Sequence, residues 1–457
     1  MDIPGKRLHS VILDEEKCKG CTICVTTCPT EAIRVRDGKA RINEDRCIDC
    51  GECIRRCPHH AKKTMADDIL SSRNPSGPAA YDYKIALPAP SLYGQFSARY
   101  SIGDIHAALL TLGEGSGFDE VFPVASASPF IAQAARTLLE KKDGEALVRP
   151  LISSSCPTII KFIQIRYPTL LSHIIPVIAP MELAGRMARE RALEKIAFSS
   201  MQKKPRIGVF FISPCAGKIT EAAAPLGNEK SSIDGVFSMK DIHLLLHASL
   251  LKLENRFRDS GTAADEIAWG RAGGEAEATI AGSEFSYLAV DGMDQCNKIL
   301  AAVEDGKCTD IDFLELMACS GGCVGGPLTV ENPSLARHTL RAREKVLSGP
   351  ARTQRETRYK PISNENDEKV CKNCLRREEF PARPALLLDT DYQKALQMMD
   401  SMEQIAAGLP GLDCGCCGAP NCHALAEDIV RGNAQRSDCV IILKEQYREL
   451  LENGAET

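Results

Sequence analysis

The sequence lacks the features of membrane and secreted proteins. No apolar run approaches the ~18 residues needed to cross a bilayer. Residues 1–7 contain no apolar signal core, and Lys6-Arg7 is not a twin-arginine signal. A basic excess is also missing, because 56 Lys and Arg stand against 61 Asp and Glu, for a net charge of −5. This balance argues against a nucleic-acid-binding surface. We therefore expect a cytoplasmic protein that binds neither membranes nor nucleic acids.

Cysteine, in contrast, is abundant. The 457 residues include 21 cysteines, an odd number that cannot pair completely within one chain. Disulfides are rare in the cytoplasm, and inert buried thiols would be scattered along the sequence. Here most cysteines fall in tight groups at two- and three-residue spacings. The sequence therefore predicts that most of them are metal ligands.

Two polar stretches, residues 71–78 and 351–369, separate three cysteine-bearing blocks. We predict domains at residues 1–75, 80–350 and 370–457. The middle block alternates short apolar runs with amphipathic stretches at 131–141 and 239–253, which favours an α/β domain with parallel sheets flanked by helices. The expected strands of this domain are residues 83–87, 148–152, 207–212, 287–290 and 313–317.

The N-terminal block contains one cysteine pattern twice. Each copy reads C-x2-C-x2-C-x3-C-P, a spacing in which the fourth cysteine of each run ligates the other cluster. This block resembles bacterial ferredoxins over about residues 1–65, which implies an α+β ferredoxin-like domain with two [4Fe–4S] clusters. The predicted ligands are Cys18, Cys21, Cys24 and Cys57 for one cluster, and Cys47, Cys50, Cys53 and Cys28 for the other.

Cysteines of the middle block follow predicted strands. Cys156 follows 148–152, Cys215 follows 207–212, and Cys319 and Cys323 follow 313–317. Ligands of open α/β sheets gather at the carboxyl ends of strands, so four thiolates could hold one cubane there. Glycines around Cys323 would let the backbone approach a bulky inorganic ligand.

These segments resemble the three signature motifs of the [FeFe] hydrogenases, over roughly residues 83–335. The resemblance implies an H-cluster: a [4Fe–4S] cube on these four cysteines, joined through Cys323 to a two-iron unit with carbon monoxide, cyanide and a bridging dithiolate amine. It implies that Lys218 hydrogen-bonds one cyanide and that Met317 packs against the two-iron unit. The remaining residues expected to line the cofactor are Ala89, Pro90, Ser91 and Pro214.

The sequence departs from this family along the proton route. Catalytic members place a proton-relaying cysteine immediately before the first cubane ligand, where this chain has Ser155. An aliphatic alcohol relays protons poorly near neutral pH compared with a thiol. The family's acidic relay residues would align near Ala134 and Ala135, which cannot carry protons. Four acids are candidate substitutes, although each is equally well explained as a surface or helix-capping residue: Glu275, Glu277, Glu182 and Glu315.

The C-terminal block offers a further cluster site. Its pattern C-x2-C-x4-C-x16-C resembles the small helical iron–sulfur domain found in corrinoid proteins and beside sensory hydrogenase domains. The predicted ligands are Cys414, Cys417, Cys422 and Cys439, and Cys416 competes in register with Cys417. Cys371-x2-Cys374 is a redox pair, half of a further site or an incidental pair, and the sequence does not decide between these; no role is assigned to Cys296 or Cys308.

The resemblance therefore implies a sensory-type [FeFe] hydrogenase of low turnover that acts on H2 and protons. It would carry four [4Fe–4S] clusters and the two-iron unit, depend on maturation enzymes and pass electrons to a redox or signalling protein. One alternative is a metabolic hydrogenase with a non-standard proton path. Another is a non-catalytic relative that assembles iron–sulfur clusters, which would have no evident use for Lys218 or Met317.

Overall fold

The computed structural model describes residues 9–67, 80–112, 117–141, 148–197, 205–227, 230–253, 264–348, 373–376 and 378–454. The predicted linkers at 71–78 and 351–369, and Cys371, lie outside these residues. The chain forms two compact units. The larger unit comprises Met1–Ser10 and Met65–Ala382, and the smaller comprises Val11–Thr64 and Arg383–Thr457.

Two parallel sheets build the larger unit. One has the strand order β6-β5-β8-β9 and the other the order β10-β11-β7. The α/β class expected from the sequence is therefore confirmed. The strand bounds are β5 (Tyr83–Pro88), β6 (Glu120–Val121), β7 (Leu151–Ile152), β8 (Ile207–Ser213), β9 (Gly235–Ser238), β10 (Tyr287–Asp291) and β11 (Phe313–Met317).

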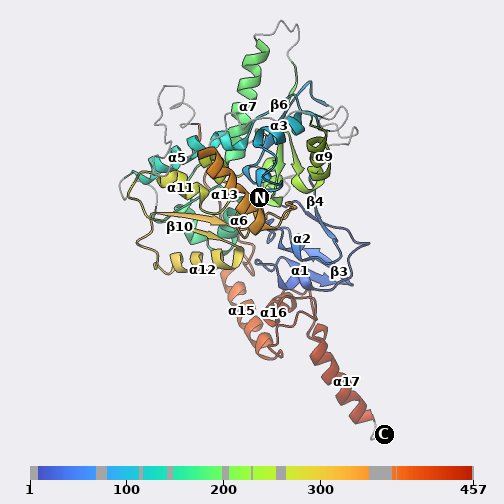
Figure 1. The fold of residues 1–457 in the computed structure, drawn as a ribbon. Helices are drawn as coiled ribbons and strands as arrows, with labels where there is room; N and C mark the ends of the chain where they lie inside the picture. Colours follow the sequence, from blue (N-terminus) through green and yellow to red (C-terminus); the bar gives the residue numbers. More distant parts are fainter. Residues whose placement is uncertain are drawn as a thin grey trace. The chain divides into compact units, whose positions relative to one another are not determined.

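Helices cover these sheets. In the second sheet α11 and α12 contact both β10 and β11, and Figure 1 shows them on opposite faces of it. The helices of this unit are α3 (Ile102–Leu110), α5 (Ser128–Leu139), α6 (Pro157–Arg166), α7 (Pro180–Ala197), α8 (Ala216–Ala223), α9 (Met239–Lys252), α10 (Ala264–Ala268), α11 (Gly274–Ile280), α12 (Met293–Glu304) and α13 (Pro333–Ser348). The single-turn and 3-10 segments are η2 (Pro90–Gly94), η3 (Val124–Ala127), η4 (Pro168–His173) and η5 (Cys323–Gly325).

The strands that were expected from apolar runs are mostly buried. All seven residues of β8 are buried, as is typical of a parallel strand covered by helices. The strand expected at 148–152 is shorter, because only Leu151–Ile152 pairs. Val148 is exposed and Pro150 has no N–H to donate to a ladder, which explains the later start.

The smaller unit combines the two ends of the chain. Its N-terminal part pairs β1 (Val11–Leu13) with β4 (Lys62–Thr64) and β2 (Ile33–Arg36) with β3 (Lys39–Ile42), both antiparallel. Two short helices carry cysteines between these strands. Further helices follow Arg383. The helices of this unit are α1 (Ile23–Thr26), α2 (Glu52–Arg56), α15 (Tyr392–Ala407), α16 (Cys422–Val430), η6 (Arg436–Asp438) and α17 (Val440–Gly454).

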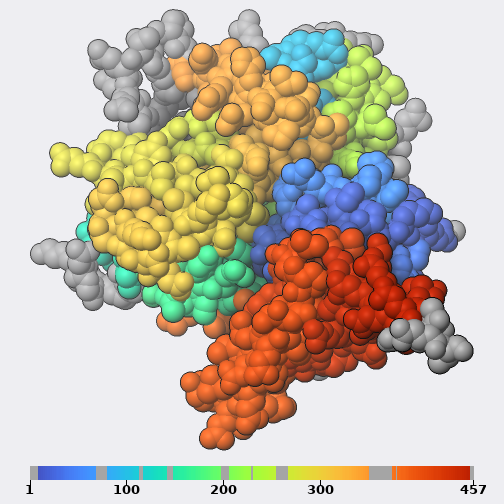
Figure 2. Space-filling model, turned by 90° about the horizontal axis from the view of Figure 1, so that it is seen from below, coloured from blue at the N-terminus to red at the C-terminus, as the bar shows by residue number. Residues whose placement is uncertain are grey.

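Buried ion pairs join the two parts of the smaller unit. The Arg46 guanidinium donates two hydrogen bonds to the Glu427 carboxylate, and both side chains are buried. Arg34 Nε and Arg36 Nη2 both donate to Asp428 Oδ2, at 2.7 and 2.6 Å. Figure 2 shows the red C-terminal helices packed against the blue N-terminal residues. The predicted first and third domains thus form one compact unit.

Candidate cluster sites and active-site cavity

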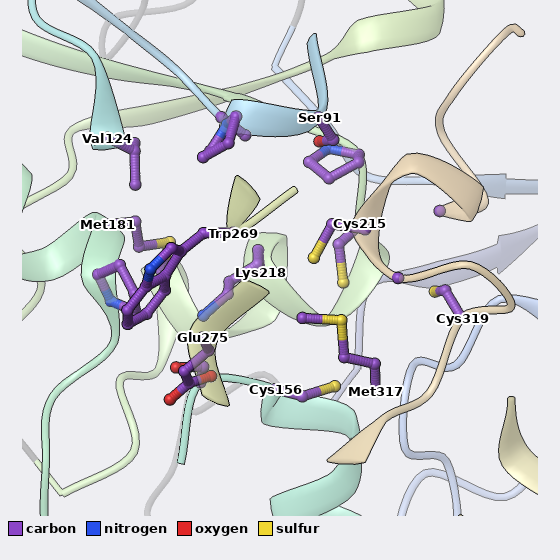
Figure 3. A pocket seen from close by; sticks show the side chains of 18 of the residues that line it. Ser91, Val124, Cys156, Met181, Cys215, Lys218, Trp269, Glu275, Met317 and Cys319 are labelled. Carbon is purple, nitrogen blue, oxygen red and sulfur yellow. The ribbon is translucent and has the colours of Figure 1, made fainter. Parts of the chain in front are cut away.

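Four cysteines of the larger unit meet at one cavity. Cys156 follows β7, Cys215 follows β8, and Cys319 and Cys323 follow β11, each at the carboxyl end of a parallel strand. All four line a cavity of about 100 Å³, which Figure 3 shows from close by. The sheet topology therefore brings together thiols that lie up to 167 positions apart in the sequence.

Local structure prepares these cysteines for ligation. Cys156 and Cys215 are the N-caps of α6 and α8, where the helix dipole favours a thiolate. Gly322, next to Cys323, has φ +92°, and a Cβ there would lie 2.4 Å from the backbone nitrogen of Ala272. Only glycine lets the two backbones come so close at this edge of the cavity.

The chemistry of the cavity fits a large cofactor. Burial raises the pKa of Cys215 to about 12, and neighbouring Cys319 and Cys156 contribute to this rise. Burial also raises the pKa of Cys156 and Cys323. Crowded buried thiols of this kind lose their protons when a metal coordinates them. The residues present therefore fit an iron–sulfur cluster.

Two hydrogen-bond donors on the cavity wall, a serine hydroxyl and an indole N–H, point to a polar ligand. Ser91 Oγ and Trp269 Nε1 are buried and have no hydrogen-bond partner among the described residues. Buried donors of this kind are costly unless something accepts from them. Trp269 is the only tryptophan of the chain, and it lies outside the motifs that predict the cavity. No spacing or motif in the sequence ties it to the cysteines.

Lys218 also lines this cavity. Its Nζ donates to Glu221 Oε2 at 2.8 Å, and both side chains are largely buried. Burial opposes the ammonium charge, but attraction from Glu221 and the nearby cysteines outweighs it and raises the pKa of Lys218. Lys218 therefore stays cationic inside the wall. The other expected cofactor neighbours also line the cavity: Ala89, Pro90, Pro214 and Met317.

Ser155 and Glu275 lie together at the cavity. Both line it, and Ser153 Oγ donates to Glu275 Oε1 at 2.7 Å. Burial raises the pKa of Glu275 to about 7, although hydrogen bonds from Ser153 and Ser155 act in the opposite direction. Glu275 can therefore exchange a proton near neutral pH. Ala134 and Ala135 are buried in the apolar core of the unit.

Glu315 lies near Glu275 and does not line the cavity. Its two carboxylate oxygens accept the backbone N–H groups of Gly273 and Ala276, at 2.8 and 2.7 Å. Burial, followed by the charge of Glu275, raises the pKa of Glu315 to about 8. The charge of Glu277 also raises the pKa of Glu315. The half-exposed carboxylate of Glu277 forms an ion pair with Arg271.

Glu182 lies apart from this row of acids. It accepts hydrogen bonds from Ser231 Oγ and from the backbone N–H of Ser232, and it does not line the cavity. Burial raises its pKa, and the charge of Glu221 acts in the same direction. The structure therefore brings three of the four candidate acids together and separates Glu182 from them.

The raised pKa of Glu315 predicts a pH dependence of stability. The folded protein holds a proton on this carboxyl up to about pH 8, whereas the unfolded chain releases it near pH 4.5. The resulting stabilisation is full below about pH 4.5 and is lost as pH rises through about 8. The midpoint temperature of thermal unfolding is measured on anaerobically reconstituted protein between about pH 5 and about pH 8. As pH rises, this temperature should fall more steeply for wild type than for Glu315→Gln. Equal slopes for wild type and this variant would contradict the assignment, and the half-exposed Glu277→Gln serves as control.

The smaller unit contains two cysteine-lined cavities of about 20 Å³ each. Cys18, Cys21, Cys24 and Cys57 border the first, and Cys28, Cys47, Cys50 and Cys53 border the second. Lys62 lines the first cavity, and its buried Nζ has no hydrogen-bond partner among the described residues. A buried, unpartnered ammonium suits an anionic cluster, so both the grouping and the charge fit iron–sulfur clusters.

Cysteines of the C-terminal segment gather at the start of α16. Burial raises the pKa of Cys417, and the charges of Cys439 and Cys414 act in the same direction. Cys422 is the first residue of α16, which Asn421 caps. Cys416 is exposed and contacts the carbonyl oxygen of Cys414 at 3.8 Å. This geometry fits a cluster site here.

Three family models match the chain. The model described as "Iron only hydrogenase large subunit, C-terminal domain" matches residues 82–274 and 262–327. A 4Fe-4S dicluster domain matches residues 10–58, and a model for an Fe-S cluster matches residues 409–441. The first match spans more than half of the chain.

Individual proteins resemble the same regions. The periplasmic [Fe] hydrogenase large subunit of Nitratidesulfovibrio vulgaris is 28% identical over 70% of this chain and 86% of its own length. Iron hydrogenase 1 of Clostridium pasteurianum is 25% identical over 70% of this chain and 65% of its length. A cytosolic Fe-S cluster assembly factor NAR1 homolog of Schizosaccharomyces japonicus is 29% identical, over 28% of this chain and 25% of its length. The solved structure of a variant of apo [FeFe]-hydrogenase HydA1 from Chlamydomonas reinhardtii aligns with a TM-score of 0.49 and 15% identity, over 68% of this chain and 97% of that one.

Among the described residues, no helix combines the length and apolar character that crossing a bilayer requires. The cytoplasmic location stays a prediction, which cell fractionation tests.

Proposed function

Because the chain belongs to the iron-only hydrogenase large-subunit family, we propose that it binds an H-cluster and interconverts H2 with protons and electrons at low turnover, as a sensor of H2 or redox state. One observation carries this proposal. Four cysteines, the Lys218 ammonium and two further donors without a partner among the described residues, Ser91 Oγ and Trp269 Nε1, line a single cavity. That set of donors matches a cluster whose further ligands are polar.

Each cavity residue has a defined part in this proposal. Cys156, Cys215 and Cys319 would hold the cubane together with Cys323, which would also bridge to the two-iron unit. When bound, the two-iron unit supplies the site at which H2 is cleaved or formed. Lys218 and Ser91 would donate hydrogen bonds to its cyanides, because charge-assisted and buried hydrogen bonds are strong where water is excluded.

The proton route of this proposal replaces the family's usual one. Protons would pass between Ser155 at the cavity, Glu275, Glu315 and the half-exposed Glu277. The raised pKa values of Glu275 and Glu315, about 7 and about 8, suit proton exchange near neutrality. The serine hydroxyl is the weak step, since its proton is far less acidic than that of a thiol. We therefore expect slow turnover.

Electrons would move through the smaller unit. Val35 lines the first cysteine cavity, and its backbone N–H donates to the carbonyl oxygen of Gly418 at 2.9 Å, next to Cys417. Arg36 Nη1 donates to the Cys417 carbonyl at 3.1 Å. The C-terminal cluster would therefore exchange electrons with the cluster of Cys18, Cys21, Cys24 and Cys57, and pass them to a redox or signalling protein. Maturation enzymes would supply the two-iron unit.

Two measurements separate this function from its alternatives. Infrared spectroscopy of matured protein should show carbon monoxide and cyanide bands, and their absence would favour a cluster-assembly role like that named for the fungal relative. Turnover as fast as that of metabolic hydrogenases would instead favour a metabolic enzyme with a non-standard proton path.

We expect four cubanes before maturation. Anaerobically reconstituted protein should contain about sixteen irons, and Cys414→Ser should lower this to about twelve. Iron analysis combined with Mössbauer spectroscopy measures both values. Cys416→Ser is the matched control, because it alters the neighbouring exposed thiol and should keep all four cubanes if Cys417 is the ligand. About twelve irons in wild type, unchanged by Cys414→Ser, would remove the C-terminal cluster.

We expect Lys218→Ala to lose most of the two-iron unit. The substitution removes the cation that would bind a cyanide, a contact on the order of 1.5–3 kcal/mol or roughly 10- to 100-fold in retention. Cyanide band intensity per cubane measures retention. Lys298→Ala is the control, since Lys298 also pairs with an acid of its own helix but is exposed. Full retention with unshifted bands in Lys218→Ala would refute the assignment.

A further inference from the structure

A segment from beyond the predicted H-cluster domain packs into the larger unit. Residues 373–376 lie beside residues 176–178, with Leu375 bridged to Val177 in antiparallel fashion. The Ile178 N–H donates to the Cys374 carbonyl at 2.8 Å, and the Arg376 N–H donates to the Pro176 carbonyl at 2.7 Å. These backbone hydrogen bonds fix the segment in place and set the direction of the Arg376 side chain.

The Arg376 side chain is only 1% exposed. Its Nε donates to the Val177 carbonyl at 2.8 Å, its Nη1 donates to the Leu226 carbonyl, and its guanidinium lies 4.8 Å from the centre of the Phe380 ring. Nη2 has no hydrogen-bond partner among the described residues. It faces a carboxylate oxygen, Glu221 Oε1, at 3.7 Å.

Glu221 thus lies between two cations. Its Oε2 accepts from Lys218 Nζ at 2.8 Å, and its Oε1 faces Arg376. A buried carboxylate that has a single cationic neighbour offsets the charge of that cation, because opposite charges attract strongly where water is excluded. With a second cation on its other side, the row of three groups keeps a net positive charge. The charge of Glu182, the next acid, also attracts the Arg376 guanidinium. The Glu182 carboxylate itself accepts hydrogen bonds from Ser231 and Ser232.

We propose that Arg376 is a positioning residue for Lys218: by sharing Glu221, it leaves the Lys218 ammonium able to donate to an anionic ligand in the cysteine-lined cavity. This inference rests on the proposed function, because that ligand is the cyanide of the two-iron unit. It also gives the segment between the H-cluster domain and the C-terminal cysteines a direct electrostatic influence on the cavity.

The test compares four variants of the full chain: Arg376→Gln, Arg376→Lys, Arg376→Gln combined with Glu221→Gln, and Arg186→Gln. The double variant removes the Arg376 cation and the Glu221 carboxylate together. The positive charge of Lys218 is then no longer offset by a neighbouring carboxylate, so a net positive charge remains, as in wild type. Arg186 is the control for docking of the segment, since its Nη1 donates to the Asn373 carbonyl at 3.2 Å and no ion pair joins it to Glu221 among the described residues.

Two readouts are measured besides turnover. One is the reduction potential of the cavity cubane in protein reconstituted with cubanes alone, identified by loss of its signal in Cys319→Ser. The other is the retention and frequency of the cyanide bands after maturation. Arg376→Gln should lower the potential, because net positive charge favours the reduced cluster, and should reduce retention about three- to tenfold. Arg376→Lys, the double variant and Arg186→Gln should stay near wild type in both readouts.

The outcomes separate the inference from the function. An unchanged potential in Arg376→Gln overturns the inference, and so does failure of the double variant to restore it, because a purely structural arginine would not be rescued by removing its partner. If wild type shows no cyanide bands, the proposed function fails, while the cubane potential still decides the role of Arg376.

Discussion

Replacing Glu275 by glutamine is expected to slow H2 turnover by about 10²- to 10⁴-fold, the range supplied by a positioned acid or base. The amide keeps the shape of the side chain and can still accept from Ser153 Oγ, but it cannot take up or release a proton. In wild type, H2 oxidation should rise as pH increases through about 7, because the carboxylate form of Glu275 accepts the proton. This rise should disappear in the variant. H2 uptake with an artificial electron acceptor measures both effects.

Control variants identify the route. Iron content and cyanide bands of Glu275→Gln should match wild type, so that the loss lies in proton transfer and not in assembly. Glu277→Gln should have a small effect, because Glu277 is half-exposed and water can replace it. Glu182→Gln should leave the pH profile unchanged, since Glu182 lies away from the cavity. A Glu275→Gln protein with native turnover would place the proton route elsewhere.

Gly418→Ala is expected to detach the C-terminal cluster segment from the ferredoxin-like part of the smaller unit. Gly418 has φ +82°, and a Cβ there would lie 2.1 Å from the carbonyl oxygen of Val35. The left-handed conformation costs an alanine roughly 1–2 kcal/mol, and the clash with backbone adds about 1–3 kcal/mol. A combined loss of about 3 kcal/mol should make residues 383–454 sensitive to protease. It should also abolish magnetic coupling between the C-terminal cluster and the cluster of Cys18, Cys21, Cys24 and Cys57.

Gly411→Ala provides the matched control for this experiment. Gly411 has a similar φ of +66°, yet no atom lies within 4 Å of the position its Cβ would take. It should therefore show the conformational cost without the clash, and retain both protease resistance and coupling. Electron paramagnetic resonance of reduced protein reports the coupling. If Gly418→Ala behaves like Gly411→Ala, contact through Val35 does not hold the two parts together.

The two Arg–carboxylate clusters explain how the two ends of the chain join in the smaller unit. Arg46 with Glu427, and Arg34 and Arg36 with Asp428, pair charges that are 381 to 394 positions apart in the sequence. Each pair is largely buried, so removing one partner leaves an uncompensated charge. Nothing in the periodicity or spacing of the sequence identifies such partners, because long-range ion pairs leave no local pattern.

The sequence by itself determined the fold class and singled out the groups of cysteines, whose assignment to clusters stays a prediction. The two N-terminal cysteine runs have short, fixed spacings typical of cluster ligation, and parallel strands buried on both faces require near-continuous apolar runs such as 207–213. Both patterns are local, so both can be read along the chain. The same holds for Ser155, whose departure from the family pattern is visible in the residue preceding Cys156.

The tertiary structure alone decided which candidate acids lie close to one another. Glu275, Glu277, Glu182 and Glu315 look alike in sequence, yet burial at the cavity raises the pKa of Glu275, while Glu182 is held by Ser231 and Ser232 elsewhere. The structure also brought Trp269 to the cavity and Arg376 to Glu221. Burial and the approach of distant charges depend on the packing of the whole chain, and no short stretch of sequence contains that information.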